Sequence, residues 1–326
     1  MPVNDIIACS VAAERAGFGI VSVGESFFRD GFALASAIAS HTRKVQLGTS
    51  IMPIYTRSPF QLAMGAATLN ELSMGRVDFL GLGIGYKART EQYFGIRQTQ
   101  RLERMKEYVE IIRNLLSGEE TSYHGKLFDL DKFPRLSNRP QNIPVYFGSS
   151  APKMLALAGK TADGVILNSI STPEYVNFAR ETIISAAKQE GRDPSRIEIG
   201  HSVIYAVCDD GQKAIDAAKE DILFYCSYPE IDPVIEKSQF KNEVSKIREL
   251  YSKGDKKVAL SYITDEMLDT FAVYGSPKEC RIKLQKFVRR GVTLPIIRTS
   301  VGSYPEHEQK QVFLRTINSL DHWKPK

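Results

Sequence analysis

The chain has 326 residues, of which 43% are hydrophobic and 25% charged, and its formal net charge is +5. This composition excludes a disordered tail, a collagen-like fibre and a small disulfide-stapled domain. Basic and acidic residues are mixed along the chain, and no nucleic-acid motif accompanies them. The positive excess therefore fits a small anionic ligand, and we expect no nucleic-acid partner.

The four cysteines, Cys9, Cys208, Cys226 and Cys280, form no Cys-x-x-Cys pair and have no histidine at metal-ligand spacing. We expect buried free thiols in a reducing cytoplasm and no bound metal. The sequence has no apolar run of about 18 residues and no charged-then-apolar leader, which predicts a cytoplasmic protein with no membrane partner.

Short runs rich in Val, Ile and Phe alternate with amphipathic stretches along the chain. The runs predict strands at 20–23, 45–51, 77–82, 145–147, 164–167, 198–207 and 294–299. The stretches predict helices at 4–16, 33–39, 58–72, 102–116, 153–159, 173–190 and 277–289. Continuous apolar strands that alternate with helices indicate an α/β fold, a parallel sheet covered by helices.

Two features of this order leave the architecture open. Residues 211–274 form a helical insertion before the last strand, with two or three helices expected, as a lid or as a packing element. The alternation fits a doubly wound sheet or an eight-stranded barrel. No strand precedes the first helix, so a closed barrel would lack its first strand.

A glycine-rich stretch follows the strand that begins near residue 77. Gly81, Gly83 and Gly85 stand at its carboxyl end, where glycine lets a flat ring or a phosphate approach the backbone, although a tight turn would use glycine too. Tyr86 and Glu91 follow in the same loop and are candidates to donate a hydrogen bond or a proton to a substrate.

A second candidate site covers residues 147–154. A strand ends at Gly148, Ser149, Ser150 and Ala151 follow, and a helix opens with Pro152 and Lys153. The free N–H groups of a helix start favour an anion, so these residues predict a phosphate site. The alternative is ordinary helix capping by Ser150.

Two further loops follow predicted strands. Thr49 and Ser50 could hydrogen-bond a ligand, and Tyr55 and Arg57 could line the rim of its site. Glu25 comes directly after the first strand, at the edge of the sheet where α/β active sites form, or it could be a salt-bridged structural acid.

In combination these segments resemble the luciferase-like superfamily, and within it the coenzyme F420-dependent methylenetetrahydromethanopterin reductases. The resemblance covers nearly the whole chain and depends on the order and spacing of many short motifs. They include Leu47-Gly48, residues 55–59, 73–76, 83–88, 146–148, 152–168, 253–255, 265–267 and 291–293. The chain departs from the family at the pair Glu25-Ser26, at Met52-Pro53, at residues 150–152 and at Tyr86.

The resemblance implies a single (β/α)8 barrel of TIM type over residues 1–326, lacking its first strand, with the insertion before the last strand. It implies F420, with FMN as the alternative, at the carboxyl ends of the strands. It also implies a non-proline cis peptide at Ser50-Ile51, behind the ring of the cofactor, and cofactor phosphate binding by residues 148–153. Gly83 and Gly85 are expected to shape the cofactor pocket, and Tyr55, Tyr86 and Glu91 to contact the substrate.

The implied reaction is hydride transfer between reduced F420 and methylenetetrahydromethanopterin or a related small molecule, with Glu25 as the catalytic residue. Two alternatives stay open: an FMN-dependent monooxygenase, and a non-catalytic paralogue that binds a cofactor or a partner protein. The resemblance also implies a homodimer or higher homo-oligomer through residues 33–39 and 60–72, where Ala63, Gly65, Ala66 and Ala67 would permit close helix contact.

Overall fold

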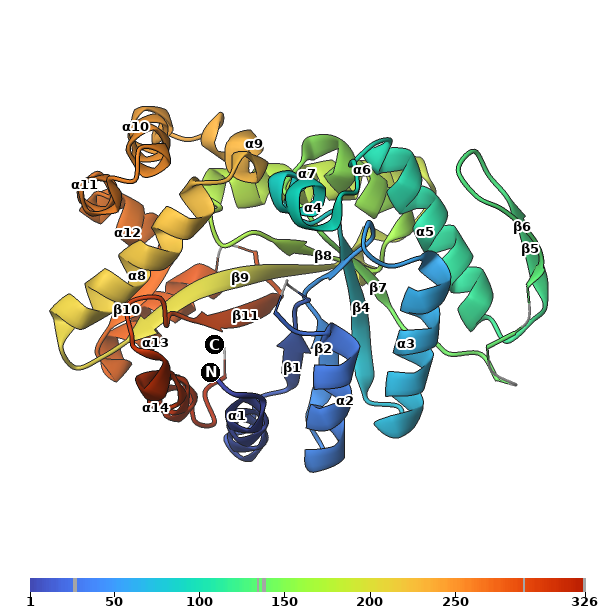
Figure 1. Cartoon of the computed structure of the whole chain (residues 1–326), viewed down its shortest axis with the longest axis horizontal. Coiled ribbons are helices and arrows are strands. Elements are labelled where there is room, and N and C mark those ends of the chain that lie inside the picture. The colour runs from blue at the N-terminus through green and yellow to red at the C-terminus, as the bar shows by residue number, and fades with distance from the viewer. Residues whose placement is uncertain (26–27, 134, 137–138, 290, 325–326) are drawn as a thin grey trace.

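A computed structural model of the chain describes residues 1–25, 28–133, 135–136, 139–289 and 291–324. Its centre is a parallel sheet of nine strands in the order β1-β2-β4-β7-β8-β9-β10, with β3 beside β4 and β11 beside β9 (Figure 1). The strands are β1 (Ile20–Val23), β2 (Gln46–Thr49), β3 (Met52–Pro53), β4 (Val77–Gly83), β7 (Val145–Gly148), β8 (Gly164–Leu167), β9 (Glu198–Val207), β10 (Ala272–Gly275) and β11 (Leu294–Thr299).

The sheet curls on itself as a TIM-type barrel. Ile20 of β1 and Ile296 of β11, which stand near opposite ends of the strand order, pack against one cluster of Phe79, Tyr146 and Ile166 inside the sheet. The rings of Phe79 and Tyr146 stack at 4.5 Å. Within the described residues no strand precedes the first helix and no backbone ladder joins β1 to β11, as expected for a barrel without its first strand.

Helices cover the outside of the sheet, and most of them follow a strand in the chain (Figure 1). Two of them, α3 and α13, begin with complete capping boxes, Ser58 with Gln61 and Ser276 with Glu279, each followed by proline at the first turn. The helices are α1 (Val3–Arg15), α2 (Gly31–His41), α3 (Pro59–Leu72), α4 (Lys87–Phe94), α5 (Arg101–Leu116), α6 (Pro152–Thr161), α7 (Pro173–Gln189), α13 (Pro277–Val288) and α14 (Glu306–Ser319).

The insertion carries more structure than the sequence predicted. It holds α8 (Gly211–Cys226), α9 (Asp232–Ile235), α10 (Lys241–Ser252), α11 (Lys256–Ser261) and α12 (Asp265–Phe271). These helices bury their own apolar cluster against the far end of β9 and against β10, and they gather at one side of the molecule (Figure 1). The short strands β3 and β10 and the antiparallel hairpin of β5 (Thr121–His124) and β6 (Asp129–Phe133) were not predicted, because strands of two to five residues carry little periodicity.

Three predictions, on the cysteines, on membrane spans and on the small residues of α3, can be compared with this fold. All four cysteines are free thiols and buried, as expected. No helix in the described part of the chain is both long and apolar enough to cross a membrane. The small residues of α3 face inward: Ala63 and Ala66 are fully buried, and the ring of Phe32 in α2 lies over Gly65.

Candidate active site at the carboxyl ends of the strands

A bulge between β2 and β3 forms the floor of the site. The Ser50–Ile51 peptide bond is cis, as the family resemblance implied. The side chain of Ile51 lies over two strand ends: a Cβ atom would stand 2.6 Å from Ile51 Cδ1 at Gly83 and 2.5 Å from Ile51 Cγ2 at Gly148. A side chain at either strand end would therefore force Ile51 to shift, which the glycine-rich motif alone could not reveal.

Thr49 and Ser50 use their hydroxyl groups to hold this bulge. Thr49 Oγ1 accepts from the Gly81 N–H at 2.8 Å and donates to the Gly81 carbonyl at 3.1 Å. Ser50 Oγ lies 2.9 Å from Ser22 Oγ in β1. The structure thus brings both predicted residues to the site, where their polar atoms position the backbone.

The loop between β7 and α6 has the features of an anion site. Helix α6 begins after Ala151 without a side-chain cap, and Ser149 Oγ accepts from the Ala151 N–H at 3.0 Å. Ser150 is buried and does not cap the helix; its Oγ has no hydrogen-bond partner among the described residues. Lys153 is exposed in the first turn of α6. A buried hydroxyl without a partner, an uncapped helix start and a lysine suit a phosphate oxygen.

Glu25 lies at the end of β1 and is bound by Arg57, which precedes α3. Arg57 Nε donates to Glu25 Oε1 at 2.8 Å and Arg57 Nη2 to Glu25 Oε2 at 2.7 Å. The Gly31 N–H donates to Oε2 at 2.9 Å, and the Glu25 N–H donates to the Ile51 carbonyl in the bulge at 3.0 Å. The hydrogen bonds that Arg57 donates to Glu25 raise the pKa of Arg57 above its ordinary value, so the guanidinium keeps its charge beside the floor of the site.

Tyr86, after β4, contacts the insertion. Its ring centroid lies 4.3 Å from that of Tyr228 and 6.1 Å from that of Phe224, and the guanidinium of Arg89 lies over all three rings. Glu230 accepts from the Lys87 N–H at 2.8 Å. Burial raises the pKa of Tyr86, so its hydroxyl keeps its proton and remains a donor. The insertion is therefore joined to the loop that follows the glycine-rich strand.

The other two residues predicted to contact the substrate, Tyr55 and Glu91, contact the segment between α4 and α5. The Tyr55 hydroxyl donates to the Thr99 carbonyl, and Glu91 Oε1 accepts from the Gln98 N–H at 3.3 Å. Both side chains thus support the segment between α4 and α5. Gly85 adopts a positive φ of 68°, which glycine tolerates without strain, and so turns the chain towards Tyr86.

The sequence did not single out a pair of charged residues near this loop. Arg298, at the end of β11, lies with its Nη2 atom 3.5 Å from Asp221 Oδ1 of α8, and its guanidinium is 5.9 Å from the Phe224 ring. Both side chains line a cavity of about 300 Å³. Burial raises the pKa of Asp221, and its Oδ2 atom has no partner among the described residues. In the sequence, only the position of Arg298 at the end of an apolar strand could have indicated this pair. Its partner Asp221 lies far away in the sequence.

The fold and the position of this site are those of TIM-barrel enzymes, whose active sites form at the carboxyl ends of the strands. Residues 1–294 match the family model described as luciferase-like monooxygenase. The chain belongs to this luciferase-like family.

Several known proteins are similar to the chain, two of them over almost its whole length. It is 31% identical to the 5,10-methylenetetrahydromethanopterin reductase of Methanolobus tindarius, over 95% of each chain. The structure of the coenzyme F420-dependent tetrahydromethanopterin reductase from Methanopyrus kandleri superposes with a TM-score of 0.84 at 24% identity, over 99% of this chain and 96% of that one. An F420-dependent glucose-6-phosphate dehydrogenase from Segniliparus rotundus is 32% identical over 60% of this chain and 62% of its own.

Proposed function

We propose that this protein is an F420-dependent oxidoreductase that transfers a hydride between reduced F420 and methylenetetrahydromethanopterin or a related small molecule. The observation that carries the proposal is the loop before α6, where Ser150 Oγ is buried without a partner at an uncapped helix start. This loop lies beside the Ile51 bulge, since Gly148 touches Ile51. Two of the similar proteins, the Methanopyrus kandleri reductase and the Segniliparus rotundus dehydrogenase, are named as dependent on this cofactor.

The residues present fit the cofactor. Ser149, Ser150, Ala151 and Lys153 would bind its phosphate, while Ile51, supported by Thr49 and Ser50, would back its ring. Bound reduced F420 would supply a hydride that converts the methylene group of the substrate to a methyl group. The contribution of this chain is to align the two reacting carbons and to exclude water.

We propose Glu25 as the catalytic residue, acting as a carboxylate that polarises the bound substrate. Its two oxygens already accept hydrogen bonds from Arg57 and Gly31, so the side chain has a fixed orientation beside the bulge. Tyr86, whose hydroxyl stays protonated, is the proposed substrate donor. Tyr55 and Glu91 support the loop around it through their contacts with residues 98 and 99.

Titration of the purified protein with F420 and with FMN tests the cofactor. We expect absorbance changes with F420 at micromolar concentration and none with FMN. Tight FMN binding without F420 turnover would overturn the proposal in favour of a monooxygenase, and binding of neither would favour a non-catalytic protein.

The substrate is tested separately by following the absorbance of F420. With methylenetetrahydromethanopterin the assay follows the oxidation of reduced F420, and with glucose 6-phosphate at equal concentration it follows the reduction of oxidised F420. Turnover of glucose 6-phosphate alone would leave the F420 assignment intact and refute the pterin substrate.

We propose in addition a homodimer formed by the outer faces of α2 and α3. Met64 and Leu72 are 43% and 53% exposed on α3, whereas the small residues of that helix pack inside the chain. Light scattering is expected to give twice the mass of the 36.5 kDa chain. A monomeric mass, or a dimer that Met64→Ser leaves intact, would contradict this interface.

A further inference from the structure

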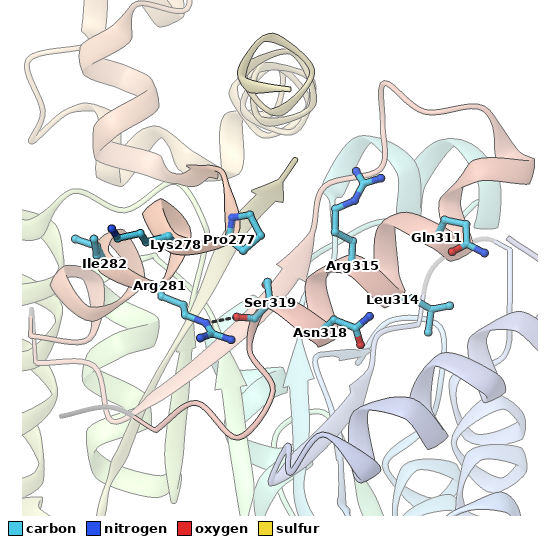
Figure 2. A pocket seen from close by; sticks show the side chains of 9 residues that line it. All are labelled: Pro277, Lys278, Arg281, Ile282, Gln311, Leu314, Arg315, Asn318 and Ser319. Atoms are coloured by element: carbon cyan, nitrogen blue, oxygen red, sulfur yellow. Dashed lines mark hydrogen bonds between the residues drawn. The ribbon is translucent and has the colours of Figure 1, made fainter. Parts of the chain in front are cut away.

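A cavity of about 750 Å³ lies on the outer wall of the barrel, between α13 and α14 (Figure 2). None of the residues assigned above to the active site lines it. Its volume is in the range typical of small-molecule sites. Its walls are formed by Pro277, Lys278, Arg281 and Ile282 of α13 and by Gln311, Leu314, Arg315, Asn318 and Ser319 of α14.

The charges that line this cavity all have one sign. Lys278, Arg281 and Arg315 face it, no carboxylate lines it, and none of the three forms an ion pair within the described part of the chain. Two lysines of the same helices that do not line the cavity are paired: Lys283 lies 3.6 Å from Asp269, and Lys310 lies 2.8 Å from Asp5. The three cations at the cavity therefore keep a positive charge there that no carboxylate of the lining offsets.

The two arginines are held at its base by uncharged partners. Arg281 Nε donates to the Ser319 carbonyl, and Arg315 Nη1 donates to Cys208 Sγ at 3.3 Å. These contacts orient each guanidinium and leave Arg281 Nη1 and Nη2 without a hydrogen bond among the described residues. An anion would find preoriented donors there, because a guanidinium binds carboxylate and phosphate oxygens through such a pair of N–H groups.

Apolar and amide groups complete the lining. Pro277, Ile282 and Leu314 offer apolar surface beside the cations, and Gln311 and Asn318 offer amide donors. We propose that this cavity binds a small molecule that carries at least two carboxylate or phosphate groups on an apolar body. The site is separate from the proposed cofactor site and does not depend on the proposed function.

Calorimetry at low salt with two probes tests the proposal. Pyrophosphate represents the phosphate source, and benzene-1,3,5-tricarboxylate represents the carboxylate source with an apolar body. We expect saturable binding of at least one probe, and weakening of about tenfold in Lys278→Gln and in Gln311→Glu. Both positions are exposed on helices, so these variants should fold, and their melting curves verify it.

Two matched variants separate this cavity from other cationic positions. Lys257→Gln and Lys286→Gln remove exposed lysines from α11 and from α13, and neither residue lines the cavity. Both variants should keep full affinity for the probe. The proposal is overturned if neither probe binds, if Lys278→Gln and Gln311→Glu leave binding unchanged, or if Lys286→Gln weakens binding as much as Lys278→Gln does.

Discussion

Arg57 and Glu25 form a forked ion pair that joins the start of α3 to the end of β1. The side chains are only 19% and 12% exposed, and two nitrogens of one guanidinium reach the two oxygens of one carboxylate. Arg57 also contacts Asp30, and its guanidinium lies 5.4 Å from the ring centroid of Phe32 in α2. One side chain thus fixes the first strand, the second helix and the third helix around the proposed catalytic carboxylate.

Replacing Arg57 by lysine should lower both stability and activity. Lysine keeps the charge but cannot form the paired hydrogen bonds, so we expect the free energy of unfolding to fall by about 2 kcal/mol. Urea unfolding measures this loss. Arg113→Lys is the matched control, because its pair with Asp163 is more exposed, at 45% and 33%, and should cost less than about 1 kcal/mol. Equal losses in the two variants would contradict a special role for Arg57.

Gly81 is a position where any side chain should damage the barrel. A Cβ atom there would lie 1.9 Å from the Thr49 carbonyl oxygen, which is backbone and cannot move aside. We expect Gly81→Ala to lower the free energy of unfolding by about 3 kcal/mol or to abolish soluble expression. Gly19→Ala, which has open space around the new methyl group, should change it by less than about 1 kcal/mol. A stable Gly81→Ala protein would show that the bulge packs differently.

The sequence predicted best those strands that are marked by a clear pattern of apolar residues. The strands at 164–167, 198–207 and 294–299 match the structure residue for residue, since each is a short apolar run bounded by turn residues. The cis peptide at Ser50–Ile51 was available only from the family resemblance, because no local pattern specifies it.

Side-chain partners were much harder to predict than elements. Glu25 and Arg57 are 32 positions apart, and Arg298 meets Asp221 across the insertion, so only the folded chain reveals either pair. For Thr49 the sequence suggested a ligand contact, whereas its hydroxyl is used within the sheet by Gly81. Polar residues at strand ends can thus serve the backbone as readily as a ligand.

Ser150 and Ser149 should respond differently to substitution. Ser150 Oγ has no partner in the described chain, so Ser150→Ala should leave the free energy of unfolding unchanged while weakening F420 binding about tenfold. Ser149→Ala deprives the Ala151 N–H of its acceptor and should lower the free energy of unfolding by about 1 kcal/mol. Fluorescence titration and urea unfolding measure the two effects. Unchanged F420 affinity in Ser150→Ala would remove Ser150 from the phosphate site.

Glu14 should make stability depend on pH. Its Oε2 atom accepts from the backbone N–H groups of Arg43, Lys44 and Val45 at 2.8, 2.6 and 2.9 Å. Burial pushes the pKa of this carboxyl upward, but the three donors outweigh that effect, so the pKa lies below its ordinary value. The ionised form is therefore favoured by folding, and its contribution is present above the unfolded pKa of about 4.3.

Glu14→Gln tests this linkage. At pH 7 the variant should have a free energy of unfolding about 1–2 kcal/mol below that of the natural protein, because an amide oxygen is a weaker acceptor than a carboxylate. The difference should shrink as the pH falls through the unfolded and then the folded pKa, since Glu14 becomes protonated and loses its advantage. Urea unfolding at pH 7, 5 and 4 measures it. Glu71→Gln, at an exposed position of α3, should show no such trend. A difference that stays constant, or that grows on acidification, would mean that the three hydrogen bonds do not favour the charged form.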